Sequence, residues 1–378
     1  MNEFGWLEHR GDPEVLAYLQ AENRYAETVM EGTARLQETL RREITARTAP
    51  TDVSVPVRSG DYLYYQRTRA GRRYRIYCRR RAAPGGPEEI VLDENELAVG
   101  HDHFRLGAFS LSPDHRYLAY SVDTIGDERF SIQVKDLDRG DVLDDVVPTA
   151  SYGVEWANDS RTFFYLVPDG SGRPHRLYRH TIGTDRDADV EVHQENDSAF
   201  SLSVTRTRSG RFLLLLIASL TSTEVRYLDA DSPAGDLVLV EPRRPGIGYW
   251  VTHQDDAFIV RTNDQAPNFR IVRAPLTDPS RSNWREIVAH RADVQIEHVD
   301  AFRNHLVIVE RCDGVRRLMV LRTSTGEEHH VALPEPVHNV WPGPNLEFDT
   351  NVLRFLYSSP VTPTCIFDYD MDGRRLTL

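Results

Sequence analysis

Hydrophobic residues follow a helical spacing near the start of the chain and a different pattern after it. The helical series over residues 12–46 consists of Val15, Leu16, Leu19, Tyr25, Val29, Met30, Leu36, Leu40 and Ile44. Asp12 can cap this helix and Pro13 can occupy its first position. Residues 45–52 are rich in Thr, Ala and Pro, which is typical of a linker. The pattern predicts a helical arm over residues 1–50 and a separate domain over residues 51–378.

From residue 52 onward, short apolar strands alternate with tight polar turns. Seven such turns carry Gly60, Asp114, Asp159, Gly210, Asp255, Asn304 and Asn351. They recur about every 48 residues, which indicates an array of repeated units. Each turn precedes a strongly apolar strand, such as residues 212–218, and then a half-polar strand. A more polar fourth strand closes most units, and residues 374–378 are expected to supply it in the last one.

Four strands in each of seven units predict an all-β fold, a seven-bladed β-propeller with four-stranded antiparallel blades. Middle strands lie between neighbouring blades and are therefore continuously apolar. Outer strands meet water on one side and therefore alternate. A solenoid is the rival array, but its repeats are usually shorter, and a β-sandwich needs far fewer strands.

Composition narrows the class of protein. The 378 residues are 40% hydrophobic and 27% charged, which is ordinary for a globular chain with a large core. No apolar run approaches 18 residues, so neither a membrane span nor a membrane partner is predicted. The net charge of −13 disfavours binding to nucleic acid.

The first residues and the cysteines indicate the compartment. Residues 1–6 have neither the basic region nor the apolar region of a secretory signal. Cys78, Cys312 and Cys365 are far apart and form no CxxC pair, which fits a reducing environment and no zinc site. We therefore expect a cytoplasmic protein.

Motifs for catalysis and cofactor binding are missing from the sequence. It contains no Gly-x-Ser-x-Gly string, no P-loop and no GxGxxG string. Ser171 lies in a Gly-Ser-Gly segment that is expected to be a hairpin tip. No catalytic residue, no cofactor-binding residue and no cofactor are therefore predicted.

Clusters of polar residues also have simpler interpretations than a functional site. The pairs His101 with His103 and His329 with His330 lack a third ligand at a fixed spacing, so no metal site is predicted. Adjacent carboxylates, at 144–145 and 255–256, point to opposite faces of a strand and form no dyad there. The arginine runs 79–81 and 316–317 are expected to be solvated strand edges.

Several strings occur in the order typical of one known family. They are Asp-Pro-Glu-Val-Leu-Ala-Tyr-Leu at 12–19, Leu-Gly-Ala-Phe at 106–109, Ser-Pro-Asp-His at 112–115, Thr-Asn at 262–263, Ala-Pro-Asn-Phe-Arg at 266–270, Glu-His-Val-Asp at 297–300 and Asp-Tyr-Asp at 368–370. Over essentially the whole chain, they resemble the oligopeptidase B (protease II) branch of the prolyl oligopeptidase family.

The resemblance implies a cytosolic serine-type endopeptidase in which a seven-bladed propeller caps an α/β-hydrolase domain. In such enzymes the propeller admits short peptides, the oligopeptidase B branch cleaves after Arg or Lys, and the hydrolase domain carries Ser, Asp and His. That domain follows the propeller, and no position here matches its motif, so the chain is expected to be inactive alone. The implied partners are short peptides, once a hydrolase domain is present, and a separately encoded catalytic domain.

Other interpretations stay open from the sequence. A gene fragment, a split gene and a deliberately shortened chain are all compatible with it. The alternative function is a stand-alone propeller that binds a protein or peptide partner. The oligomeric state and the loops that would face a peptide are not determined by these patterns.

The resemblance also concerns the ring seam and the helical arm. In the family, no strand is exchanged between the first and last blades, so residues 52–57 are expected in blade one and the seam is expected to depend on side-chain packing alone. The arm of relatives packs on the hydrolase domain. Without that domain, residues 1–50 are expected to be mobile or self-associating.

Overall fold

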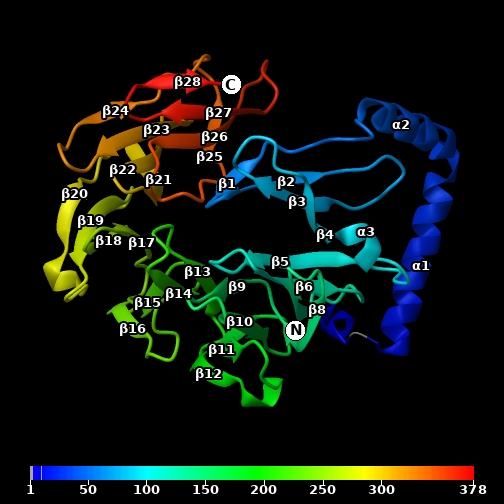
Figure 1. Ribbon diagram of the computed structural model, residues 1–378. Coiled ribbons are helices and arrows are strands. Elements are labelled where there is room, and N and C mark those ends of the chain that lie inside the picture. The colour runs from blue at the N-terminus through cyan, green and yellow to red at the C-terminus, as the bar shows by residue number, and fades with distance from the viewer. Residues whose placement is uncertain (1–2, 10) are drawn as a thin grey trace. The chain divides into compact units, whose positions relative to one another are not determined.

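The computed structural model describes residues 3–9 and 11–378 (Figure 1). The chain divides into two compact units. One comprises residues 1–52 with residues 68–72, and the other comprises residues 53–67 with residues 73–378. No helix in the described ranges is long and apolar enough to cross a bilayer.

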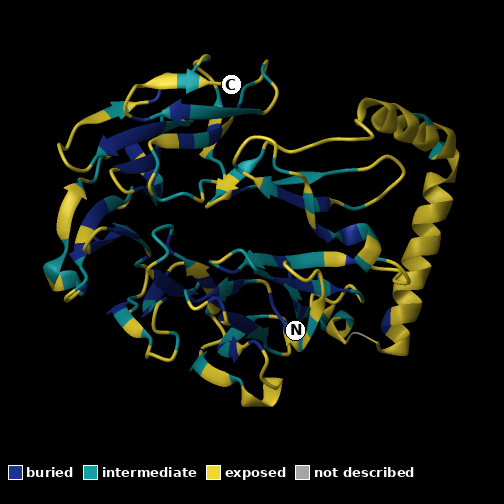
Figure 2. Ribbon diagram, in the orientation of Figure 1, coloured by how far each residue is buried: buried dark blue, intermediate teal, exposed yellow. Residues whose placement is uncertain are grey.

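The first unit is helical. It contains η1 (Gly5–Glu8), α1 (Pro13–Met30), η2 (Glu31–Thr33) and α2 (Ala34–Arg47). The predicted cap is confirmed, because the Glu14 backbone N–H donates to the Asp12 carboxylate at 2.8 Å and Pro13 begins the helix. The apolar series is exposed along most of both helices, which Figure 2 shows as yellow ribbon.

The second unit contains, in its described residues, seven four-stranded antiparallel sheets that confirm the predicted β-propeller (Figure 1). Each blade is built from four consecutive strands, as predicted. Blade 1 has β1 (Val57–Ser59), β2 (Tyr62–Arg67), β3 (Ile76–Arg81) and β4 (Glu89–Asp93); blade 2 has β5 (Arg105–Leu111), β6 (Tyr117–Asp123), β7 (Phe130–Asp136) and β8 (Val142–Ala150); blade 3 has β9 (Val154–Trp156), β10 (Thr162–Pro168), β11 (Pro174–Thr181) and β12 (Val190–Gln194).

The remaining blades follow the same plan. Blade 4 has β13 (Ser201–Arg206), β14 (Phe212–Ala218), β15 (Thr223–Asp229) and β16 (Val238–Glu241); blade 5 has β17 (Tyr249–Gln254), β18 (Ala257–Thr262), β19 (Arg270–Pro275) and β20 (Arg285–Val288); blade 6 has β21 (Val294–Ala301), β22 (His305–Cys312), β23 (Val315–Arg322) and β24 (Glu328–His330); blade 7 has β25 (Asn339–Pro342), β26 (Val352–Ser358), β27 (Cys365–Asp370) and β28 (Arg375–Thr377). Short helices α3 (Glu94–Leu97), η3 (Arg186–Ala188) and η4 (Arg281–Asn283) lie in connections between strands.

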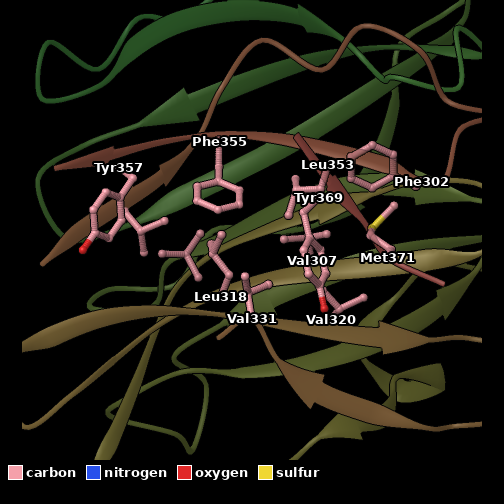
Figure 3. Close-up of a cluster of buried hydrophobic side chains, with 12 residues drawn as sticks. Phe302, Val307, Leu318, Val320, Val331, Leu353, Phe355, Tyr357, Tyr369 and Met371 are labelled. Atoms are coloured by element: carbon pink, nitrogen blue, oxygen red, sulfur yellow. The ribbon is translucent and has the colours of Figure 1, made fainter. Parts of the chain in front are cut away.

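The apolar core lies between neighbouring blades. Strand β14 shows why its sequence is continuously hydrophobic: Leu213 and Leu215 pack in the cluster shared with blade 3, whereas Phe212 and Leu214 pack in the cluster shared with blade 5. Figure 3 shows the corresponding cluster between blades 6 and 7, which includes Phe355. Both faces of β14 are thus removed from water, as the sequence pattern predicted for a strand between two blades.

The junction between blades 7 and 1 has a different character. Within the described residues, buried apolar clusters join every other pair of neighbouring blades but not this pair. Two hydrogen bonds join it instead: the Gly60 N–H donates to Glu347 Oε1 at 2.7 Å, and Arg354 Nη1 donates to the Pro56 carbonyl at 2.6 Å. The expectation of side-chain packing alone is therefore wrong, because both bonds involve the backbone of blade 1.

The strands at the seam have the predicted connectivity. β28 pairs with β27 and completes blade 7 from the last residues of the chain. β1 pairs with β2, and Val53 bridges to Arg67 of the same blade. No strand is exchanged across the described part of the seam, as expected from the family resemblance.

Candidate functional site

A central cavity of about 890 Å³ is bounded by all seven blades. The first strand of every blade supplies at least one lining residue; examples are Ser59 of β1, Glu155 of β9, Trp250 of β17 and Trp341 of β25. Its volume lies in the range of ligand sites, roughly 300–1,000 Å³. The cavity is therefore the candidate functional site.

Blade 5 places Arg261 and Trp250 on the cavity wall, with Phe269 packed against Arg261. The guanidinium carbon of Arg261 lies 4.1 Å from the ring centroid of Trp250 and 4.4 Å from that of Phe269. Arg261 Nη1 donates to the Ile296 carbonyl at 3.2 Å. Burial lowers the pKa of Arg261 to about 10, although the nearby Glu297 carboxylate opposes this change.

Glu297 is engaged by two other arginines. Its Oε1 accepts from Arg311 Nε at 2.5 Å and its Oε2 accepts from Arg316 Nε at 2.6 Å. Burial favours the neutral acid, but these two arginines outweigh it and lower the pKa of Glu297. Arg316 also lies over the Trp341 ring, 4.8 Å from its centroid.

The opposite wall contains a second acid in a different environment. Glu155 lies near Arg206. Burial of the Glu155 carboxyl group raises its pKa from the ordinary 4.5 to about 7, although the positive charge of Arg206 acts in the opposite direction. Arg206 donates to the Asn158 side chain and, at 3.1 Å, to the Gly210 carbonyl. The carboxyl group of Glu155 therefore titrates close to neutral pH.

Arg208 connects blades on different sides of the cavity. It lies in the β13–β14 turn of blade 4, and its Nη2 donates to Asp300 Oδ1 at 2.7 Å. Its Nη1 donates to the Ala301 carbonyl at 3.1 Å, and its Nε donates to the Asn345 carbonyl at 2.6 Å. These acceptors belong to blade 6 and to the β25–β26 connection of blade 7. Because blades 4 and 7 are three positions apart in a ring of seven, the side chain crosses the ring.

Asp300 fixes the far end of that side chain. Burial favours its neutral form, but the nearby His298, whose Nε2 lies 3.7 Å from Asp300 Oδ1, and the charge of Arg208 outweigh burial and lower the pKa of Asp300. The guanidinium of Arg208 also lies 4.3 Å from the Phe302 ring centroid. A charge-assisted bond with aromatic support of this kind holds one rotamer of a long side chain.

The polar candidates from the sequence lie outside this cavity. Ser171 is in the β10–β11 turn, where its hydroxyl donates to Asp169 at 2.6 Å. His329 contacts the Tyr369 hydroxyl at 2.9 Å, whereas His330 contacts Glu310 at 3.0 Å. The described residues contain no group of three or more side chains that could hold a metal ion.

The adjacent carboxylates lie in two different settings, 144–145 within β8 and 255–256 in the turn between β17 and β18. Asp144 is exposed, whereas Asp145 accepts from the Gly183 N–H at 2.9 Å. Asp255 lies in the β17–β18 turn, and Asp256 pairs with Arg273. These pairs therefore do not act as dyads.

The arginine runs require a correction. Arg79 is only 3% exposed; its Nε donates to Glu89 at 2.7 Å and its Nη1 donates to the His115 carbonyl at 2.6 Å. Arg316 pairs with Glu297, and Arg317 pairs with the buried Glu310 at 3.0 Å. The expectation of a solvated edge is wrong for Arg79, which is buried, and incomplete for Arg316 and Arg317, which are partly buried and paired with carboxylates of low exposure.

The cavity residues Glu155, Arg208 and Arg261 were not predicted from the sequence. A weak signal was present for two of them: Glu155 lies in the first strand of its blade, and Arg208 lies in the turn that follows such a strand, whereas Arg261 lies in the second strand of blade 5. Residues 205–208 read Thr-Arg-Thr-Arg immediately before the Ser-Gly turn of blade 4. Without the ring, that string is indistinguishable from a solvated hairpin.

The fold and the cavity define a seven-bladed β-propeller that encloses a central cavity lined by apolar and charged residues. Residues 2–378 match the family described as prolyl oligopeptidase, N-terminal beta-propeller domain. The chain belongs to this family, which confirms the resemblance found in its sequence.

Individual relatives agree with this assignment. The chain is 34% identical to dipeptidyl aminopeptidase BI of Pseudoxanthomonas mexicana, over 97% of this chain and 53% of that protein. It is 33% identical to protease 2 of Moraxella lacunata, over 98% of this chain and 54% of that protein. The chain thus spans about half the length of the curated relatives it matches.

Solved structures show the same partial coverage. Oligopeptidase B from Trypanosoma brucei with covalently bound antipain, in a closed form, superposes with a TM-score of 0.91 at 32% identity. Oligopeptidase B from Leishmania major superposes with a TM-score of 0.92 at 27% identity. Each comparison covers 99% of this chain and 55% of the other.

Proposed function

We propose that this chain is the substrate-gating propeller of an oligopeptidase B-like serine peptidase, a cytoplasmic enzyme that hydrolyses short peptides after Arg or Lys. The observation that carries the proposal is the central cavity with Arg208 crossing the ring beside it. A domain of even ~50 residues has a radius of gyration of about 10 Å, which is too large for a cavity of about 890 Å³. An extended peptide segment is much narrower, so the cavity discriminates against folded proteins.

Peptide bond hydrolysis needs catalytic groups, and no position in these 378 residues matches the sequence motif that carries the nucleophile. Peptide hydrolysis by a serine peptidase uses a nucleophile, a base and oxyanion donors together. In this proposal a hydrolase domain supplies them, either in a longer form of the protein or as a separate chain. The propeller selects what reaches that domain and is itself without peptidase activity.

The first test is an activity assay. The purified 378-residue chain is incubated with a chromogenic peptide that ends in Arg, and we expect no turnover. Turnover that an active-site serine reagent abolishes would contradict the proposal that catalysis resides in a hydrolase domain outside this chain. The DNA downstream of the coding region is then examined for a hydrolase-like reading frame with a Gly-x-Ser-x-Gly string.

The second test concerns gating. With the hydrolase domain present, Arg208→Ala is expected to increase the rate of cleavage of longer peptides more than that of dipeptide substrates. Arg303→Ala is the matched control, because Arg303 pairs with Asp349 at 2.9 Å and both side chains are exposed. Equal effects of the two variants on all peptide lengths would contradict gating by Arg208. Binding of a folded partner without any peptide cleavage would favour a stand-alone binding module.

A further inference from the structure

Within the described residues, two arginines of the central cavity, Arg206 and Arg261, have no hydrogen-bonded carboxylate, and Arg261 has the fewer hydrogen-bond acceptors of the two. In the part of the chain that the structure describes, the Arg261 guanidinium has a single hydrogen-bond acceptor, the carbonyl oxygen of Ile296. The other cavity arginines differ, because Arg206 is bonded to Asn158 and Gly210, and Arg208 uses its three nitrogens on Asp300, Ala301 and Asn345. Arg261 therefore keeps free donors on the cavity wall.

The nearest acid, Glu297, forms no hydrogen bond with Arg261. Both oxygens of Glu297 are occupied by Arg311 and Arg316, at 2.5 and 2.6 Å. The group formed by Arg261, Arg311, Arg316 and Glu297 thus contains three positive charges and one negative charge. An anion that enters the cavity at Arg261 meets a local excess of positive charge.

Aromatic rings fix the guanidinium and shape the site. Trp250 and Phe269 lie against Arg261, and Trp341 lines the cavity from blade 7. Stacking limits the freedom of the guanidinium before any ligand arrives, so less entropy is lost when it binds one. Exposed tryptophan faces beside the charge favour an organic anion over a small, strongly hydrated ion.

We propose that Arg261, held by Trp250 and Phe269, is a carboxylate-binding site that receives a carboxylate group of a peptide in the channel. Its planar fork matches the two oxygens of a carboxylate, and the partial burial of the guanidinium strengthens such a bond. The carboxylate comes either from the C-terminus of the peptide or from an Asp or Glu side chain. The proposal rests on the proposed function only in that peptides enter the cavity.

The experiment uses the full chain and its own tryptophan fluorescence, because Trp250 touches Arg261. Three probes are titrated: a tetra-alanine peptide with a free C-terminus, the same peptide with a C-terminal amide, and an amidated peptide of the same length that contains one Glu. We expect the free acid to bind at least about tenfold more tightly than the amide. Tight binding of the Glu-containing amide would identify side-chain carboxylates as a second source.

Variants locate the site. Arg261→Met is expected to reduce affinity for the free acid at least about tenfold and to leave affinity for the plain amide unchanged, while Arg261→Lys retains part of the difference. Arg243→Met is the matched control: Arg243 also stacks on an aromatic ring, Phe200, at 4.0 Å, but is paired with Glu195 at 2.7 Å and does not line the cavity. The Arg243→Met chain should bind the free acid and the amide with the same affinities as the unmodified chain.

Two results would overturn the proposal. One is equal affinity of the unmodified chain for the acid and the amide, a comparison that needs no variant to fold. The other is a folded Arg261→Met chain that still prefers the acid. Neither depends on hydrolysis, so failure of the carboxylate site is distinguishable from failure of the peptidase proposal, which the reconstituted cleavage assay measures.

Discussion

Glu155 allows the electrostatics of the cavity to be measured as a pH dependence of stability. The perturbation is Glu155→Gln, which keeps the shape of the side chain and removes its charge. Burial raises the pKa of Glu155 from 4.5 to about 7 in the folded chain. In the unfolded chain the carboxyl group is solvated and ionises near its ordinary pKa of 4.5.

The sign and size of the effect follow from linkage. Because the folded pKa is the higher one, the contribution of Glu155 to stability is fully present below pH 4.5 and is lost as pH rises through 7. A shift of this size corresponds to about 3 kcal/mol once pH exceeds 7, and water in the cavity reduces it to about 2 kcal/mol. The Gln variant cannot ionise, so its stability relative to the unmodified chain should rise by that amount between pH 5 and pH 8.5.

The assay is urea unfolding followed by circular dichroism at several pH values. Glu328→Gln is the control, since Glu328 is exposed on β24 and away from the cavity. We expect a pH-dependent stability difference for the Glu155 variant and a small, nearly constant one for the control. A constant difference for Glu155→Gln across this range, or a variant less stable than the unmodified chain at pH 8.5, would refute the reasoning.

Three further predictions concern stability. Glu310→Gln should lower the free energy of unfolding, measured in urea, by about 3 kcal/mol or more, because the fully buried carboxylate binds Arg291, Arg317 and His330. A decrease below about 1 kcal/mol would contradict this expectation. Phe355→Ala should cost about 3–5 kcal/mol in the same assay by leaving a cavity between blades 6 and 7, and a near-neutral result would contradict tight packing there. Limited proteolysis should cut near residue 47 and leave residues 52–370 intact, whereas early cuts within the blades would contradict the predicted mobility of the arm.

The middle strands were predictable because their surroundings are uniform. Residues 212–218 are apolar throughout since both faces of β14 pack on neighbouring blades. The first strands gave a weaker signal: β9 has three residues, and its central Glu155 lines the cavity. A short strand with one face toward water and the other toward a blade has no periodicity that distinguishes it from a loop.

The cavity residues were not predictable for a different reason. Arg208 is bonded to residues 92, 93 and 137 positions away in the chain, so its role exists only after the ring has closed. The same holds for Arg79, which is buried by a contact with the carbonyl of His115 in the next blade. The local sequence indicates secondary-structure propensity and the spacing of buried positions. It does not indicate which carbonyl group, far away in the chain, will accept a hydrogen bond from an arginine.

The contacts around the ring indicate which blade is held least firmly. Twelve buried residues form the cluster between blades 6 and 7, and Arg208 adds a bond from blade 4 to the Asn345 carbonyl of blade 7. The cluster between blades 1 and 2 has four buried residues, with eight partly buried hydrophobic residues packed against them, and two hydrogen bonds link blade 1 to blade 7. Local opening requires the least free energy where the least apolar surface is exposed. Opening at the seam therefore displaces blade 1 while blade 7 stays with the rest of the ring.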